Sequence, residues 1–163
     1  MATQVVEKSP LGLENPMGTD GFEFVEYTAP DTTLLRDLFT KMGFPAVARH
    51  QRKEVTLHRQ GDINFIINAE PGSYAEAYAR DHGPSACAMA FRVKDAKAAH
   101  ERALKLGAIN VEVKGGDGEL DIPAIEGIGG SRLFSVDRNG EGKGVEGSIY
   151  EVYFDFHPDW QER

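Results

Sequence analysis

The five histidines are the first residues to consider for chemistry, because imidazole is a common metal ligand and general base in proteins. They are His50, His58, His82, His100 and His157, and they fall on a predicted turn, strand, helix end, helix and tail. No two of them have the spacing of an HxH or HxxxH ligand pair. Nothing places a serine beside a base either, so the sequence does not indicate a Ser/His/Asp triad.

The single cysteine, Cys87, lies inside an apolar stretch, 86–93, and is expected to be a small core residue rather than a nucleophile. One cysteine excludes an internal disulfide framework and fits a reducing compartment, so a cytoplasmic location is predicted. Two glycine-rich runs, at 115–118 and 140–144, lack the spacing of a phosphate-binding loop and are interpreted as turns.

The composition limits the function classes. The chain has 163 residues, 40% of them hydrophobic, and a formal net charge of −8. An acidic protein without clustered Lys and Arg is not expected to bind nucleic acid. No apolar run is long enough to span a membrane, so no membrane partner is expected.

Two stretches repeat one pattern, GFEFVEYTAPD at 21–31 and SACAMAFRVKD at 85–95. Each indicates a half-buried strand that ends in Asp and is followed by helical spacing and a glycine. Three aligned pairs share an offset of 64 residues (95 − 31 = 64): Asp31 and Asp95, Lys41 and Lys105, and Gly43 and Gly107. The repeat predicts a duplicated supersecondary unit.

The periodicity between these landmarks predicts two βαβββ modules. Module one, 21–70, is expected to contain a strand over 22–28, a helix from Asp31 or Thr32 to Gly43, and strands over 44–49, 54–59 and 63–69. A linker region, 71–84, holds a helix over 73–81. Module two, 85–157, is expected to contain a strand over 86–93, a helix over 96–106, and strands over 109–114, 120–126, 132–136 and 148–156. Residues 1–20 are expected to form an irregular arm, and 158–163 the start of an interdomain linker.

The predicted fold class is α+β, with the two modules forming a curved, cup-like mixed sheet and the helices on its outside. A sheet with helices on one face leaves the other face uncovered, so the two modules are expected to enclose that face together. The first helix is expected to cover the sheet with one apolar stripe: Leu34, Leu35, Leu38, Phe39 and Met42.

The duplicated pattern resembles the amino-terminal half of bacterial 4-hydroxyphenylpyruvate dioxygenase, through NPMGTDGFEFVEYTAPD at 15–31, HGPSACAMAFRVKD at 82–95 and IPAIEGIGGSRLFSVDR at 122–138. The broader relatives are the vicinal oxygen chelate proteins, which include glyoxalases and antibiotic-resistance binding proteins. The resemblance implies an enzyme of tyrosine catabolism that converts 4-hydroxyphenylpyruvate to homogentisate. It also implies that Fe(II) lies in a carboxyl-terminal domain.

In the ligand-bearing domain of this family, two histidines and one carboxylate hold the iron. The resemblance puts the equivalent positions on Phe24, Ala88 and Glu151, and only Glu151 can bind a metal. No metal, cofactor or catalytic residue is therefore expected in this chain, and Glu151 is expected to pair with Arg92. The expected lining of the cup is Phe22, Phe24, Glu26, Ala86, Ala88, Ala90, Arg92, Glu151 and Tyr153.

Two functions are predicted, and the sequence leaves both open. In the first, the chain is an inactive structural domain that packs on a carboxyl-terminal catalytic domain, in the same or a separate chain, and contributes to a homo-oligomer. An exposed apolar patch is expected where its partner docks. In the second, it is a stand-alone, metal-free binding protein, in which Ala86, Ala88 and Ala90 leave room for an aromatic or 2-oxo acid. A self-sufficient dioxygenase ranks last.

Overall fold

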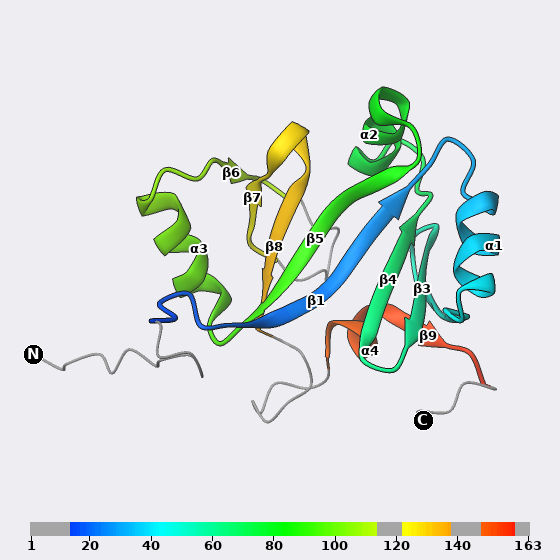
Figure 1. Ribbon diagram of the computed structural model, residues 1–163, viewed down its shortest axis with the longest axis horizontal. Coiled ribbons are helices and arrows are strands. Elements are labelled where there is room, and N and C mark those ends of the chain that lie inside the picture. Colours follow the sequence, from blue (N-terminus) through cyan, green and yellow to red (C-terminus); the bar gives the residue numbers. More distant parts are fainter. Residues whose placement is uncertain (1–13, 114–121, 138–147, 159–163) are drawn as a thin grey trace, which may run out of the picture.

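The computed structural model describes residues 14–113, 122–137 and 148–158 (Figure 1). Module one contains β1 (Thr19–Thr28), α1 (Thr33–Lys41), β2 (Ala46–His50), β3 (Val55–Gln60) and β4 (Ile63–Asn68). The helix α2 (Tyr74–His82) leads to β5 (Ser85–Val93), α3 (Ala96–Lys105), β6 (Asn110–Val111), β7 (Ala124–Glu126), the 3-10 turn η1 (Ile128–Gly130) and β8 (Arg132–Val136). The last described elements are α4 (Ile149–Tyr153) and β9 (Phe154–Phe156).

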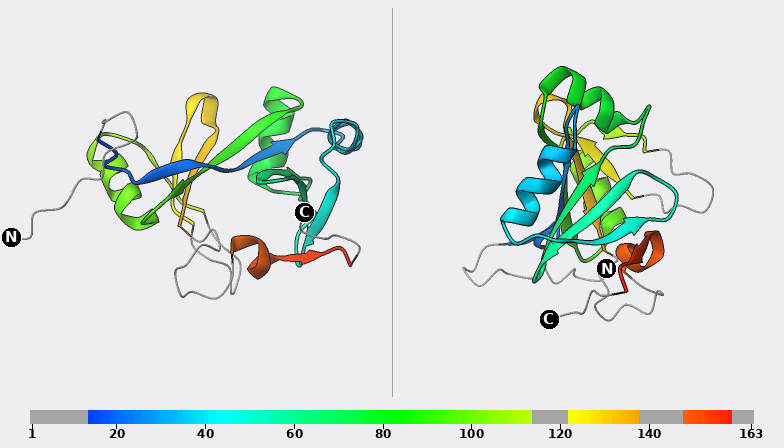
Figure 2. Two further views of the ribbon diagram at one scale, coloured as in Figure 1. Left: turned by 60° about the horizontal axis from the view of Figure 1, so that its bottom comes forward. Right: turned by 90° about the vertical axis from the view of Figure 1, so that its right-hand side faces the viewer.

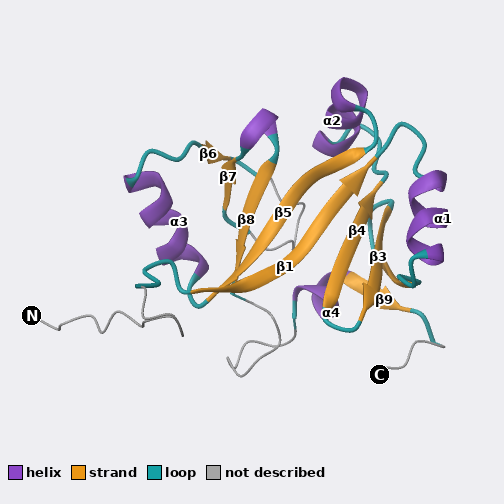
Figure 3. Cartoon of the chain, viewed as in Figure 1, coloured by secondary structure: helices purple, strands orange, loops and turns teal. Residues whose placement is uncertain are grey.

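The strands form one curved sheet in the order β6-β7-β8-β5-β1-β4-β3-β2-β9 (Figure 3). Each module contributes its strands in the same order, β1-β4-β3-β2 and β5-β8-β7-β6, as the duplicated pattern predicts. The first strands of the modules, β1 and β5, pair antiparallel at the centre, while β1 and β4 are parallel, as are β5 and β8. The predicted mixed α+β fold is confirmed.

The aspartates at the two repeated positions accept hydrogen bonds at the starts of α1 and α3. Asp95 accepts a hydrogen bond of 2.8 Å from the backbone N–H of Ala98 and so caps α3. The equivalent Asp31 accepts from the backbone N–H of Thr33 at 2.9 Å. The predicted pair of strand-ending aspartates therefore starts a helix in each module.

The predicted single apolar stripe of α1 is wrong. Leu35 and Phe39 lie one turn apart and pack toward the sheet, in a cluster with Phe44 and Ile67. Three other apolar residues share a second face of the helix and are exposed: Leu34, Leu38 and Met42. Because a helix of nine residues presents only a narrow stripe to a sheet, five apolar residues cannot all be buried there.

The predicted strand over 148–156 is also wrong in its first part. The side chain of Ser148 accepts from the backbone N–H of Glu151, and Glu151 accepts from the backbone N–H of Ser148 at 3.0 Å. This capping box starts α4, and only Phe154–Phe156 is a strand. That strand, β9, pairs antiparallel with β2 of module one.

Other boundaries differ by a few residues. The strand β1 begins at Thr19, inside the arm predicted for residues 1–20. The strands β6 and β7 cover only part of the ranges predicted for them. The glycine runs at 115–118 and 140–144 and most of the predicted linker at 158–163 lie outside the described residues.

The concave face of the sheet holds the largest core cluster. The segment α4–β9 lies against this face, on the opposite side of the strands from α1 (Figure 2). Its residues Ile149, Tyr150 and Phe154 join buried side chains from both modules. The chain thus closes its own cup with its last described segment.

Candidate functional site

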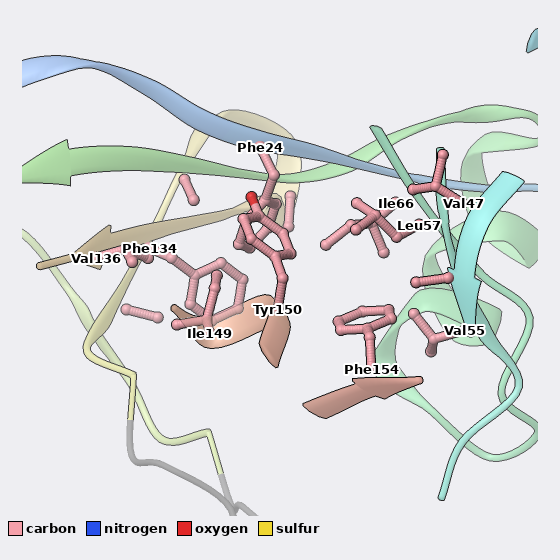
Figure 4. Packing of buried hydrophobic residues seen from close by; sticks show 14 residues of the cluster. Phe24, Val47, Val55, Leu57, Ile66, Phe134, Val136, Ile149, Tyr150 and Phe154 are labelled. Atoms are coloured by element: carbon pink, nitrogen blue, oxygen red, sulfur yellow. The ribbon is translucent and has the colours of Figure 1, made fainter. Parts of the chain in front are cut away.

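The centre of the concave face is apolar at the positions that resemble metal-ligand positions. Phe24 and Ala88 are both buried there, and the ring of Phe24 lies 6.0 Å from the ring of Phe134 (Figure 4). Tyr150 and Phe154, from α4 and β9, pack onto the same cluster. The centre of the cup is therefore filled by side chains.

The concave face does not have the expected room for a ligand above Ala88 and Ala90. Ala88 is 3% exposed and Ala90 is 0% exposed, both within the core cluster. Only Ala86, nearer the start of β5, is exposed. The prediction that Ala88 and Ala90 leave space for a ligand is wrong, because the last described segment packs over them.

A β-bulge in β1 changes which residues face the cup. Phe22 pairs with Phe91 and Phe24 with Ala90, so Glu23 is an extra residue in the pairing with β5. The bulge interrupts the alternation of side chains. Phe22 therefore packs against Phe91 with the two rings tilted and 5.1 Å between their centroids. It lies beside the α3 cluster and is 60% exposed. The prediction that Phe22 lines the cup is wrong.

Glu23, which the sequence reasoning missed, is the centre of a buried polar network. Its carboxylate accepts from Nε of Arg92 at 3.0 Å. Its backbone carbonyl, released from the ladder by the bulge, accepts from Nδ2 of Asn64 and from the hydroxyl of Tyr150, both at 3.0 Å. Arg59 donates to Asn64 at 2.7 Å and lies over the Tyr150 ring. Burial raises the pKa of Tyr150, which keeps its hydroxyl a donor.

The predicted pair of Glu151 and Arg92 is therefore wrong, since Arg92 pairs with Glu23. Glu151 is exposed and its carboxylate is bonded to Ser148 at the start of α4, so it does not line the cup. Tyr153, on the same helix, packs against the core cluster and stacks on His50 with 5.8 Å between ring centroids.

A second polar group lies nearer the end of β1. Oε1 of Glu26 accepts from Nδ2 of Asn68 at 2.8 Å, and Sγ of Cys87 lies 3.7 Å from the same oxygen. Burial raises the pKa of Glu26, and the bond from Asn68 opposes this shift. Burial also raises the pKa of Cys87, which is fully buried, so the predicted core thiol is confirmed.

Cys87 is itself a bulged residue, because Tyr27 pairs with Ala86 and Glu26 with Ala88. The two bulges, at Glu23 and Cys87, share the offset of the repeat (87 − 23 = 64). Each of these two bulges thus sits one residue before a position that resembles a ligand position.

The residues at these positions do not fit an Fe(II) site. Phe24 and Ala88 have no donor atoms, and Glu151 faces away from the cup. Within residues 14–113, 122–137 and 148–158, no three His, Cys, Asp or Glu side chains are grouped so that they could hold a metal ion. The polar residues of the concave face that the sequence reasoning missed are Glu23, Arg59, Asn64, Asn68, Arg132 and Tyr150.

The duplicated βαβββ arrangement around a concave sheet defines a glyoxalase-like fold. The chain belongs to the family described as hydroxyphenylpyruvate dioxygenase, HPPD, N-terminal, which it matches over residues 13–155. It is similar to Hemolysin VllY of Vibrio vulnificus, with 54% identity over 152 residues, and to a 4-hydroxyphenylpyruvate dioxygenase of Pseudomonas sp. strain P.J. 874, with 52% identity over 143 residues. These matches cover 91% and 88% of this chain.

A solved structure gives the same assignment. It is a xylose isomerase-like TIM barrel/4-hydroxyphenylpyruvate dioxygenase fusion protein, with a TM-score of 0.69 and 32% identity over 93% of this chain and 24% of that one. The chain spans only 41% and 39% of the lengths of the two curated relatives. In the part of the chain that the structure describes, no helix is long and apolar enough to cross a membrane.

Proposed function

We propose that this chain is the structural, non-metal-binding domain of a 4-hydroxyphenylpyruvate dioxygenase-like enzyme. That enzyme converts 4-hydroxyphenylpyruvate to homogentisate in tyrosine catabolism and acts in the cytoplasm. The observation that carries the proposal is the apolar closure of the cup, where Phe24 and Ala88 are buried beneath Tyr150 of α4. A face packed in this way stabilises the domain and offers no donor set for the iron.

In this proposal the Fe(II) and the substrate bind to a carboxyl-terminal domain, in the same or a separate chain, and this domain packs against it. The chain alone is inactive. The coverage of the relatives supports the proposal, because the matched region is less than half of each of them. The fusion protein supports it as well, since there a similar domain forms part of a much longer chain.

We also propose that copies of this chain associate into a homo-oligomer. The exposed stripe of α1, defined by Leu34, Leu38 and Met42, supports this contact, because large apolar side chains that share one face are typical of association surfaces. The helix α1 that carries this stripe lies on the opposite side of the strands from the α4–β9 segment that closes the cup (Figure 2).

The test combines metal analysis with oxygen uptake. The chain is assayed with Fe(II) and 4-hydroxyphenylpyruvate, alone and together with a separately produced carboxyl-terminal half. We expect neither stoichiometric iron nor oxygen uptake from the chain alone, and activity only when both halves are present. Oxygen uptake by the chain alone contradicts the proposal. Tightly bound iron that is lost in the variant Glu151→Ala also contradicts the proposal. Of the three positions that resemble ligand positions, only Glu151 has a side chain that can bind a metal.

A further inference from the structure

The convex face of the sheet, on which α1 and α3 pack, has two exposed apolar side chains near its middle. Phe22 of β1 is 60% exposed and Ile63 of β4 is 52% exposed. Phe22 packs against Phe91, which belongs to the α3 cluster. Ile63 is in phase along β4 with Phe65 and Ile67, which pack with α1. Both side chains therefore point to the side of the sheet that carries the helices.

These two side chains are neighbours across a strand pair. The strands β1 and β4 are parallel, and Nδ2 of Asn64 donates to the carbonyl of Glu23 at 3.0 Å. Phe22 precedes Glu23 and Ile63 precedes Asn64, so about one strand spacing, roughly 5 Å, separates their backbones. Figure 1 shows the middle of β1, β4 and β5 directly between α1 and α3.

The exposed stripe of α1 continues this surface. Gln60 is the register partner of Ile63 in the β3–β4 pair. Its side-chain amide donates to the carbonyls of Met42 at 3.4 Å and Gly43 at 3.1 Å. The end of the stripe is thereby held beside the start of β4.

The other two residues of the stripe face the middle of the sheet. Burial is the main cause that lowers the pKa of His58 on β3, and the charge of Arg36 lowers it further, so Arg36 lies on the β3 side of α1. Leu34 and Leu38 are each two residues from Arg36, which is about 200° around a helix. They therefore lie on the opposite side of α1, toward β1.

Packing of the fold does not require large apolar residues at these positions. The repeat gives an internal comparison, because α1 and α3 are equivalent helices. At the offset of 64, Leu34 corresponds to Ala98 and Leu38 to Arg102 (102 − 38 = 64). The same position in module two thus has a small or a charged side chain. The two leucines are a feature of module one that the shared fold does not explain.

Five side chains form one surface, which we call the convex patch: Phe22, Leu34, Leu38, Met42 and Ile63. Each is between 49% and 69% exposed. At roughly 150–200 Å² for a large apolar side chain, the patch presents about 500 Å² of apolar surface. A standard interface covers about 800 Å² on each partner, and about 65% of a homodimer interface is apolar. The patch therefore has the apolar area that one half of a stable homodimer needs.

We propose that the convex patch packs against the convex patch of a second copy, about a two-fold axis. A self-complementary surface of this kind closes as a dimer and leaves no apolar area open for further copies. The inference rests on the homo-oligomer proposed above and adds the strand half of the contact, Phe22 and Ile63, to the stripe of α1. Each copy has a formal net charge of −8, so the copies repel and added salt should strengthen their association.

The test is sedimentation equilibrium of the 163-residue chain over a range of concentrations. We expect a monomer–dimer equilibrium. Phe22→Ser and Ile63→Ser should each raise the dimer Kd by about a hundredfold, or about 2.8 kcal/mol, because each change is present twice in a two-fold contact. Leu38→Arg, which introduces the residue type found at the equivalent position of α3, should do the same. The control is Ile128→Ser, on the turn η1, which is 97% exposed outside the patch and should leave Kd unchanged.

The outcomes separate this inference from the homo-oligomer itself. If the parent chain associates and both Phe22→Ser and Ile63→Ser associate equally well, the copies meet through another surface and the inference is wrong. A parent chain that is monomeric at hundreds of micromolar overturns both. Masses that grow beyond the dimer overturn the two-fold contact. If a separately produced carboxyl-terminal half dissolves the dimer, and Phe22→Ser and Ile63→Ser abolish its binding, the patch belongs to that domain instead. Circular dichroism establishes that each variant is folded, and if Phe22→Ser is not, Ile63→Ser decides the question.

Discussion

The hydroxyl of Tyr150 donates a hydrogen bond of 3.0 Å to the backbone carbonyl of Glu23, although the two residues are 127 positions apart in sequence. The bond joins α4 to the bulge in β1, where the carbonyl is no longer used by the strand ladder. Because Asn64 donates to the same carbonyl, one extra residue in the central strand fixes the segment that closes the concave face.

Tyr150→Phe tests this connection. The substitution removes the hydrogen bond and keeps the ring, and Asn64 continues to donate to the Glu23 carbonyl. We expect the free energy of unfolding to fall by about 0.5–1.5 kcal/mol, measured by urea denaturation. The matched control is Tyr78→Phe, since the Tyr78 hydroxyl makes no hydrogen bond with the described residues, and it should change stability by less. Equal losses in the two variants contradict the role of the bond.

The apolar contacts of the closing segment should contribute more than this bond. Phe154 is 7% exposed and packs into the core cluster, so Phe154→Ala should lower the free energy of unfolding by about 3–5 kcal/mol. Phe22→Ala makes the same change at a position that is 60% exposed, and its loss should be well below this range. Urea denaturation of both variants measures the difference. Similar losses of stability in Phe154→Ala and Phe22→Ala contradict the prediction that the closing segment contributes to the core.

The sequence predicts the fold well where the pattern is local and repeated. The offset between Asp31 and Asp95 identifies two equivalent strand–helix units, and both are present with the same strand order. Cys87 is also predicted correctly, because a small residue in an apolar strand has few alternatives to burial. These features depend on neighbours in sequence.

The sequence predicts the lining of the cup less well, because the lining depends on how strands far apart in the sequence pair with each other. Strict alternation assigns Phe22 to the cup, but the bulge at Glu23 arises only when β1 pairs with β5. The pattern of residues 148–156 predicts a strand that includes Glu151, although Ser148 and Glu151 form the capping-box pattern S-x-x-E in the sequence itself. Nothing in the local sequence indicates that β9 pairs with β2, which belongs to the other module.

Glu26→Gln should change how stability depends on pH. Burial raises the pKa of Glu26 above its ordinary value of 4.5, so the folded protein holds this proton more tightly than the unfolded chain. The contribution of Glu26 to stability is therefore fully present below pH 4.5 and is lost as the pH rises through the raised pKa. The amide keeps an acceptor for Asn68 and carries no charge to bury. We expect Glu26→Gln to be more stable than the parent protein at neutral pH, with the difference decreasing toward pH 4.5.

Urea denaturation at a series of pH values measures this difference. The control is Glu54→Gln, which removes an exposed carboxylate paired with Arg49 and should follow the pH profile of the parent protein. Parallel profiles for Glu26→Gln and the parent protein contradict the assignment of a costly buried carboxylate to this site.

His58 should have the opposite dependence. His58 is buried against the edge of the Phe39 ring. Burial is the main cause that lowers its pKa below the ordinary 6.5, and the hydrogen bond to the Phe44 carbonyl opposes this shift. The folded protein then binds fewer protons than the unfolded chain, so stability is full above pH 6.5 and falls as the pH decreases through this range. Urea denaturation in the Glu26→Gln background measures this pH dependence of stability without the contribution of Glu26. The dependence should become flatter in His58→Gln and should be unchanged in His100→Gln. A pH-independent parent profile between neutral pH and the lowered pKa contradicts this prediction.

The exposed stripe of α1 makes a prediction about association. Leu34, Leu38 and Met42 lie on one face of the helix, so burial against a second copy removes apolar surface from water. We expect the double variant Leu38→Lys/Met42→Lys to shift the sedimentation profile from an oligomer toward the monomer, because two charges in a small apolar contact cannot be paired. The matched control is Leu106→Lys, an exposed leucine at the end of α3, which should leave the profile unchanged. A parent protein that is already monomeric at the same concentration, or an equal shift in the control, contradicts the assignment of this stripe as the oligomer contact.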